Sequence, residues 1–162
     1  MTLGLYAGSF DPITKGHIDI VQRAASIAGK LVLAVFDTPS KNLMFSTNER
    51  LQLCESAVVG MKNVEVTKFD GLLVEFAKSI GADFMIRGLR NITDLDYEVA
   101  MLMMNRKLNP SIDTIFLYTS QEYQSISSSL IKEVASFGGD ITDLVTENVA
   151  LAMKSKLDIK AS

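Results

Sequence analysis

The sequence predicts an α/β fold, namely a Rossmann-like, doubly wound, five-stranded parallel sheet with helices on both faces and a C-terminal helix. Short apolar runs alternate with segments of helical periodicity along the whole chain. With 162 residues, of which 48% are hydrophobic, the chain can bury one sizeable core. No repeat or low-complexity segment divides it, so we expect a single domain spanning residues 1–162.

Two strand–helix units open the chain. Residues 3–7 are a short apolar run that predicts the first strand, and residues 17–28 carry apolar side chains at helical spacing. The second strand is expected at 31–35, an uninterrupted apolar run of the kind found inside parallel sheets. A polar loop at 37–46 separates this strand from a helix that begins near Thr47.

The same alternation continues to the C-terminus. Further strands are expected at 64–67, 84–86 and 114–118. Helices are expected at 72–80, at 95–108, from a cap at Ser127 or Ser128 to Phe137, and from about 146 to 157. Asn109-Pro110 ends the longest helix, and Gly138-Gly139 ends the helix that follows it.

The formal net charge of −3 argues against a general nucleic-acid-binding protein, and we expect no nucleic-acid partner. An anionic ligand would therefore need positive charge that is concentrated locally. The basic side chains that could supply it are Lys15, Lys41, Arg87, Arg90 and Arg106.

Nothing in the sequence points to a membrane or to secretion. No apolar run approaches the ~18 residues of a membrane-spanning helix, and the N-terminus lacks the basic start and apolar stretch of a signal peptide. The single cysteine, Cys54, excludes an internal disulfide and shares a helical apolar pattern with Leu51 and Val58. We therefore expect a cytoplasmic protein in which Cys54 is a small buried residue.

The segment from Gly8 to His17 concentrates groups that bind phosphate. It joins the first expected strand to the first helix, where a Gly-rich turn and a helix N-terminus direct backbone N–H groups at an anion. The turn adds the hydroxyls of Ser9 and Thr14, the ammonium of Lys15 and the only histidine of the chain. It matches neither the dinucleotide fingerprint nor the Walker phosphate loop. The structural alternative is that Thr14 caps the helix and His17 merely lies near its end.

Two other segments follow strands in the same way. Arg87-Gly88-Leu89-Arg90 comes after the fourth expected strand, and Ser125-Ile126-Ser127-Ser128-Ser129 precedes a helix after the fifth. Guanidinium groups bind phosphate in a bidentate manner, and clustered hydroxyl and N–H groups suit a polyphosphate. Because ligands bind beyond the carboxyl ends of parallel strands, we expect the three segments to form one site.

Ordinary structural roles remain open for several of these residues. The two arginines could be solvated surface side chains, and one serine of the cluster is enough to cap a helix. Asp94 and Asp96 fit the acidic helix start that the helix dipole favours. Met101, Met103 and Met104 are expected in the core rather than at a ligand.

Together these motifs resemble the nucleotidyltransferase superfamily, which is marked by a T/H-x-G-H loop and a distal I-S-S-S/T helix start. Thr14-Lys15-Gly16-His17 and Ile126-Ser127-Ser128-Ser129 match those two elements. Within the superfamily, the chain is similar over essentially its full length to the bacterial phosphopantetheine adenylyltransferases. The more specific part of this resemblance is Arg87-Gly88-Leu89-Arg90 followed by Asp94, Tyr97 and Glu98.

The resemblance implies transfer of AMP from ATP to 4′-phosphopantetheine, giving dephospho-coenzyme A and pyrophosphate in the penultimate step of coenzyme A biosynthesis, with Mg2+ as cofactor. It implies that His17 is the catalytic residue and stabilises the transition state. The implied contacts of phosphopantetheine are Ser9, Lys41, Leu73 and Arg87. The implied contacts of ATP are Ser9, Phe10, His17, Gly88, Leu89, Arg90, Glu98, Tyr123, Gln124, Ser125, Ile126, Ser127, Ser128 and Ser129. A homohexamer and feedback inhibition by coenzyme A are also implied.

This chemistry needs no general base, because the second pKa of a phosphate lies near 6 and the acceptor is largely ionised at neutral pH. We assign His17 to the α-phosphate, Arg90 with Ser128 and Ser129 to the β- and γ-phosphates, and Lys41 with Arg87 to the acceptor phosphate.

Two other functions remain open. One is the same transfer to a different phosphate acceptor, such as nicotinate mononucleotide; the segment from Arg87 to Glu98 favours phosphopantetheine. The other is a non-catalytic ATP-binding sensor similar to the universal stress proteins, which would bind ATP and release no pyrophosphate. Such a sensor would have no use for a histidine placed at the α-phosphate.

Overall fold

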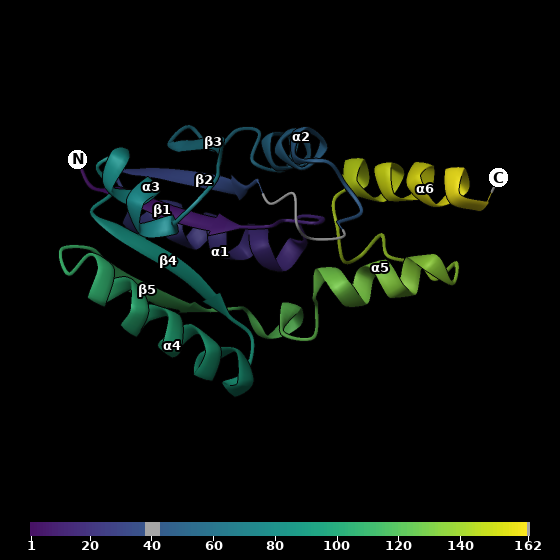
Figure 1. The fold of residues 1–162 in the computed structure, drawn as a ribbon. Coiled ribbons are helices and arrows are strands. Elements are labelled where there is room, and N and C mark those ends of the chain that lie inside the picture. The colour runs from purple at the N-terminus through teal and green to yellow at the C-terminus, as the bar shows by residue number, and fades with distance from the viewer. Residues whose placement is uncertain (38–42, 162) are drawn as a thin grey trace.

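The computed structural model describes residues 1–37 and 43–161, with side chains up to residue 158. It contains a five-stranded sheet in the order β3-β2-β1-β4-β5, and every neighbouring pair of strands is parallel (Figure 1). The chain builds outward from β1 to β3 and then crosses to β4 on the other side of β1. This reversal is the switch point of a doubly wound sheet, so the predicted fold class is confirmed.

The predicted strands and helices are all present and differ from the prediction only at their ends. The strands are Leu3–Gly8 (β1), Lys30–Phe36 (β2), Val64–Phe69 (β3), Phe84–Leu89 (β4) and Asp113–Tyr118 (β5). The helices are Lys15–Ile27 (α1), Thr47–Ala57 (α2), Leu73–Ser79 (α3), Ile92–Leu108 (α4), Ser128–Ser136 (α5) and Glu147–Ala161 (α6). A short 3₁₀ helix, Gln121–Tyr123 (η1), was not predicted. Within the described residues, no helix is both long and apolar enough to cross a membrane.

Side-chain caps explain why two helices begin earlier than predicted. Thr14 and His17 form a reciprocal capping box at the start of α1, so the helix includes the residues between them. The side chain of Asn91 accepts the backbone N–H of Asp94 and thereby caps α4. Periodicity registers only apolar side chains at helical spacing, whereas the capping residues Thr14 and Asn91 are polar.

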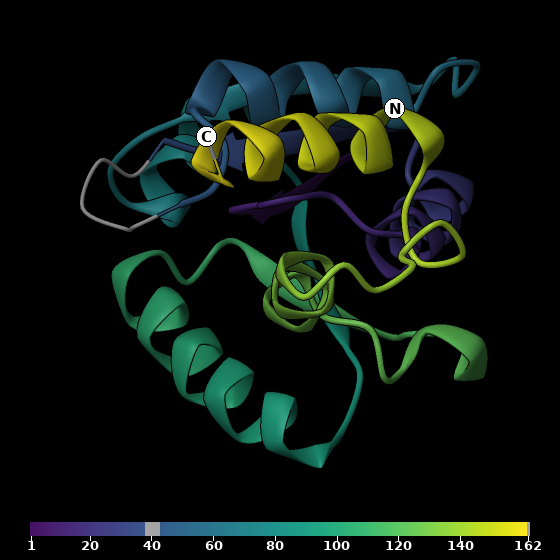
Figure 2. The ribbon, with the colours of Figure 1, turned by 90° about the vertical axis from the view of Figure 1, so that its right-hand side faces the viewer.

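Helices cover both faces of the sheet. On one face, α1, α2, α5 and α6 share a core cluster that includes Ile20, Val21, Leu53, Cys54, Ile131 and Met153. Figure 2 shows α6 alongside α2 at the top of the view and α4 at the bottom, opposite them. On the other face, α3 packs Val74 and Ala77 against β1, β2 and β4. Cys54 is fully buried, so the prediction of a small buried residue is confirmed, and burial raises the pKa of its thiol to about 12.

The methionines of α4 are not in the core, and the prediction for them was wrong. Met101, Met103 and Met104 are exposed, and Glu98 is the one buried residue of this helix. The reason is that α4 packs mainly on β4 and β5 at one edge of the sheet and leaves much of its apolar surface uncovered.

The sheet opens at the switch point. β1 and β4 pair only from Gly4 opposite Phe84 to Tyr6 opposite Ile86, although both strands continue further. Immediately beyond the last pair, the Ala7 carbonyl accepts a hydrogen bond from the Arg87 Nη1 atom at 2.9 Å. The parting of the two strands therefore creates a gap at their carboxyl ends, and a guanidinium lies in its wall.

A buried arginine fastens the loops around this gap. Arg50 on α2 is 1% exposed and donates to the carbonyls of Ser9 at 2.7 Å, Phe36 at 2.9 Å and Phe45 at 3.2 Å. Its Nη2 atom donates to the Thr47 hydroxyl at 2.9 Å. The loop after β1, the end of β2 and the start of α2 thus share one anchor.

We expect Arg50→Ala to lower the free energy of unfolding by about 3 kcal/mol, because it leaves buried carbonyl groups without a donor. Arg106→Ala is the matched control: its exposed ion pair with Asp113 should contribute no more than about 0.5 kcal/mol. Equilibrium denaturation in urea measures both values. Similar values for the two variants would contradict the anchoring role.

Candidate active site

A cavity of about 330 Å³ lies at the carboxyl edge of the sheet, where β1 and β4 part. Its wall comes from the three segments singled out in the sequence. The first supplies Ser9, Phe10, Thr14, Gly16 and His17; the second supplies Arg87, Gly88, Arg90, Asp94 and Glu98; the third supplies Ile126, Ser127, Ser128 and Ser129. The expected convergence of these segments is observed, and the ligands they bind stay a prediction.

His17 has a structural and a cavity-facing role at once. Its Nδ1 atom accepts the backbone N–H of Thr14 at 3.1 Å and lies 3.1 Å from the Thr14 hydroxyl. The ring packs edge to face on Phe10, with centroids 5.2 Å apart. Phe10 itself adopts a left-handed φ of 47°, a strained conformation for this residue type, and its ring is buried beneath the imidazole.

These contacts fix the charge and the tautomer of the imidazole. Burial, followed by the positive charges of Arg90 and Arg87, lowers the pKa of His17 to about 4. The ring is therefore neutral at pH 7. Because Nδ1 accepts a backbone N–H, the single ring proton is on Nε2, where it can donate to a ligand.

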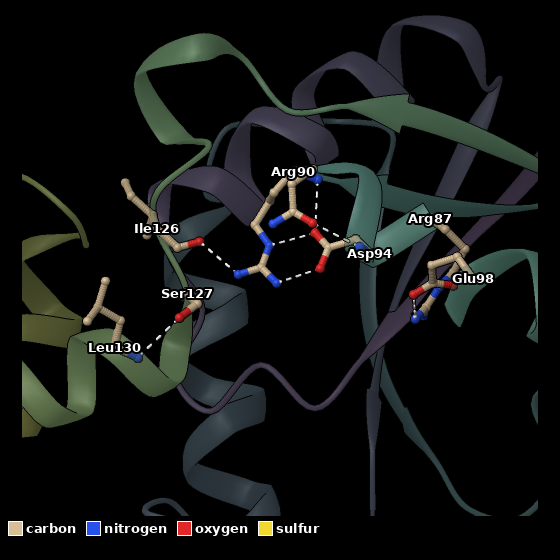
Figure 3. Close-up of polar contacts among 8 residues, drawn as sticks. Arg87, Arg90, Asp94, Glu98, Ile126, Ser127 and Leu130 are labelled. Carbon is tan, nitrogen blue, oxygen red and sulfur yellow. Dashed lines mark hydrogen bonds and ion pairs between the residues drawn. The ribbon is translucent and has the colours of Figure 1, made fainter. Parts of the chain in front are cut away.

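Arg87 is held by a carboxylate of α4. Its Nε and Nη2 atoms contact Glu98 at 2.7 and 2.6 Å, and its Nη1 atom donates to Ala7 (Figure 3). Both side chains are largely buried, at 29% and 11% exposure. Glu98, expected at ATP, thus lies against an arginine expected at the acceptor.

Arg90 is held in the same manner by Asp94, one helical turn away. The Nε and Nη2 atoms contact the carboxylate at 3.0 and 2.9 Å, and Nη1 donates to the Ile126 carbonyl at 3.2 Å (Figure 3). Partial burial would raise the pKa of Asp94, but the hydrogen bonds from Arg90 hold it below its usual range. This carboxylate does more than start a helix.

The N-terminus of α5 faces the cavity with its serine cluster. Ser127 caps the helix by accepting the Leu130 N–H at 3.1 Å. The Ser128 hydroxyl donates to the Pro12 carbonyl at 2.8 Å and so connects this helix to the loop after β1. Together with the N-terminus of α1, two positive helix ends are available to an anion.

A second, smaller cavity of about 80 Å³ adjoins the first and shares Arg87 and Glu98 with it. Leu73, expected at the acceptor, lines this second cavity together with side chains of α4. The Thr114 hydroxyl is buried there without a partner in the described residues.

The structure does not bring every predicted contact to these cavities. Leu89 is buried and does not line either one. Tyr123, Gln124 and Ser125 are in or after η1 and do not line the main cavity, although Tyr123 lies against Gly16, which does. Lys41 lies outside the described residues.

Sequence reasoning missed several residues that build the site. Asp11 is buried, accepts the N–H groups of Met44 and Phe45, and pairs with Lys132 of α5 at 2.7 Å. Its charge inside a loop predicted to bind phosphate was the available signal. For Arg50 the signal was its position on the apolar face of α2, three and four residues before Leu53 and Cys54.

Among the described residues, the ionised side chains that line the main cavity cancel in charge. Two arginines are matched by two carboxylates, and the imidazole is neutral. Within residues 1–37 and 43–161, no three or more His, Cys, Asp or Glu side chains gather as a metal-binding group.

Comparison with known proteins identifies relatives. The cytidylyltransferase-like family model matches residues 5–134. A phosphopantetheine adenylyltransferase of Alkaliphilus metalliredigens is 47% identical over 96% of this chain and 99% of its own length. One of Caldanaerobacter subterraneus is 48% identical over 96% of this chain and 98% of its own length.

Solved structures share the fold at lower identity. One described as a nicotinate-nucleotide adenylyltransferase of Vibrio parahaemolyticus superposes with a TM-score of 0.71 at 18% identity, covering 97% of this chain and 95% of that one. A lipopolysaccharide core biosynthesis protein of Thermoplasma volcanium gives a TM-score of 0.53 at 22% identity, covering 74% and 97%.

We expect the imidazole of His17 to stay neutral, with the proton on Nε2, from pH 8 down to about pH 5, because its pKa is near 4. Nitrogen-15 NMR of the tag-free protein measures this directly, since the chain has a single histidine. The same chain in concentrated urea is the control and should titrate near the ordinary value of about 6.5. A folded-state midpoint near 6.5 would contradict the assignment.

Proposed function

This chain belongs to the cytidylyltransferase-like family and, within it, to the phosphopantetheine adenylyltransferases, and we propose on that basis that it transfers AMP from ATP to 4′-phosphopantetheine. An oxygen of the acceptor phosphate bonds to the α-phosphorus as the bond to the β-phosphate oxygen breaks. The products are dephospho-coenzyme A and pyrophosphate, and the reaction is the penultimate step of coenzyme A biosynthesis.

The observation that carries this proposal is the convergence on one cavity of His17, two arginines and two helix N-termini. All of these groups donate hydrogen bonds to anions, and none of them is placed as a base. That suits a reaction whose nucleophile is an already ionised phosphate and whose difficulty is to bring two anions into line.

His17 would stabilise the charge that builds up on the α-phosphate. Its Nε2 proton is held ready by the contacts at Nδ1, and the adjacent N–H groups of α1 add a positive dipole. A neutral donor binds the ground-state phosphate weakly and strengthens its hydrogen bond as charge accumulates.

Arg90 and the serines at the start of α5 would bind the β- and γ-phosphates. Arg87 would orient the acceptor phosphate, because it lies between the main cavity and the smaller cavity that Leu73 lines. Lys41 would complete the acceptor site, as the family resemblance implies.

Mg2+ would reach the site on the nucleotide. The carboxylates at the cavity, Asp94 and Glu98, are both engaged by arginines, so the described residues suit a cation held by phosphates and water better than one held by protein ligands. When bound, the ion would offset phosphate charge that the paired arginines and carboxylates of the described cavity wall leave uncompensated.

We also propose self-association to a homohexamer and a cytoplasmic location. An interface between copies is supported by the large apolar side chains exposed on α4, namely Ile92, Leu95, Tyr97, Met101, Met103, Met104 and Leu108. Measuring the molecular mass of the protein in solution would test it. Coenzyme A contains both halves of the product, so we propose that it inhibits by occupying the same cavities.

Pyrophosphate release from ATP tests the function. Purified protein should release pyrophosphate with 4′-phosphopantetheine, and far less with nicotinate mononucleotide or with no acceptor. Preference for nicotinate mononucleotide would reassign the acceptor. ATP binding without release under any condition would mark a sensor.

We expect His17→Ala to lose about 10²–10³-fold in kcat with a smaller change in ATP affinity, because it removes a hydrogen bond that is strongest in the transition state. Steady-state kinetics and ATP calorimetry measure the two quantities. His17→Gln, whose amide can still donate, should lose less. An unchanged kcat with weakened ATP binding would refute the role.

We expect Lys41→Ala to raise KM for phosphopantetheine by about 10-fold or more and to leave KM for ATP within about 2-fold, because the family resemblance assigns its ammonium group to the acceptor phosphate and not to ATP. Lys62→Ala, which removes an exposed lysine elsewhere, is the control and should change neither constant. A rise confined to KM for ATP would show that the division of the site is wrong.

A further inference from the structure

The guanidinium of Arg90 lines the cavity and is held in one orientation by hydrogen bonds. Its Nε and Nη2 atoms donate to Asp94, and Nη1 donates to the Ile126 carbonyl (Figure 3). A guanidinium has five N–H groups, so one on Nη1 and one on Nη2 remain without a partner among the described residues. Arg87 repeats the pattern with Glu98.

Asp94 is itself fixed in place. Besides the Arg90 side chain, its carboxylate accepts the Arg90 backbone N–H at 3.0 Å. Its own N–H donates to the Asn91 side chain at 2.9 Å in the first turn of α4. The carboxylate therefore has little conformational freedom, and its hydrogen bonds restrict the Arg90 guanidinium in turn.

The same guanidinium connects two of the converging segments. The Ile126 carbonyl that it contacts directly precedes Ser127, the N-cap of α5. Arg90 thus sets the end of β4 against the start of α5, and both line the cavity.

Resting on the proposed function, we infer that Asp94 is a positioning residue: it orients Arg90, and through Arg90 the start of α5, so that the two remaining N–H groups meet the nucleotide polyphosphate. Asp94 does not touch the nucleotide in this assignment. The opposite role, in which the carboxylate competes with phosphate for Arg90, would require the pair to separate when ATP binds.

The test is a double-mutant cycle on the full-length protein with Asp94→Asn, Arg90→Ala and the double variant. We expect Asp94→Asn to lower kcat/KM for ATP by roughly 10–100-fold and to leave KM for phosphopantetheine within about 2-fold. Because Asp94 acts through Arg90, the double variant should equal Arg90→Ala within about 2-fold. Asp96→Asn, an exposed carboxylate on the same helix, is the matched control and should behave as wild type.

Asp94→Glu separates positioning from a merely structural role and serves if Asp94→Asn fails to fold. It keeps the charge at the start of α4 but shifts the carboxylate that binds Arg90. A positioning role therefore predicts a lowered kcat/KM for ATP with an unchanged midpoint of thermal unfolding. Wild-type kinetics for Asp94→Glu, effects that multiply in the double variant, or faster turnover by Asp94→Asn would each overturn the inference.

Calorimetry with ATP alone repeats the cycle without turnover. Absence of pyrophosphate release by the wild type would end the proposed function. The positioning role would still be supported if the ATP dissociation constant of the double variant equalled that of Arg90→Ala. It would be overturned if the fold-changes of the two single variants multiplied in the double variant.

Discussion

The short ladder between β1 and β4 is the constraint on which the site depends. Parallel strands that part leave backbone carbonyls without a ladder partner, and a buried carbonyl without a donor is costly. Arg87 supplies that donor to Ala7 and at the same time enters the cavity wall. The gap in the sheet therefore explains why a cation lies beside it, and Glu98 stabilises the buried charge of that cation.

The described residues of this cavity would bind an anion through oriented donors more than through net charge. Each arginine carries its own carboxylate, the histidine is neutral, and two helix N-termini direct dipoles inward. Such groups are arranged before the ligand arrives, so little reorganisation is needed when charge moves during reaction. Pairing each arginine with a carboxylate also avoids burying an isolated charge.

Much of this fold could be predicted from the sequence because apolar periodicity marks strands and helices directly. Their ends depended on polar caps, such as that of Asn91 on α4, which periodicity does not register. The Arg90–Asp94 pair has helix-like spacing, yet the helix dipole explained Asp94 equally well from sequence alone. Arg87 and Glu98 are too distant in sequence for any local rule, and only the packing of α4 on β4 joins them. The methionines of α4 were misassigned because an apolar pattern does not say whether it faces its own core.

The occupied Nδ1 atom of His17 limits what this ring can do as a reagent. Its one in-plane lone pair is directed at the Thr14 backbone, so the imidazole has none to offer an electrophilic phosphorus or a divalent ion. A phosphorylated or adenylylated histidine is thereby disfavoured by the helix cap itself. For the proposed transfer, His17 is then a hydrogen-bond donor to a direct displacement, whose stereochemical signature is inversion of configuration at the α-phosphorus.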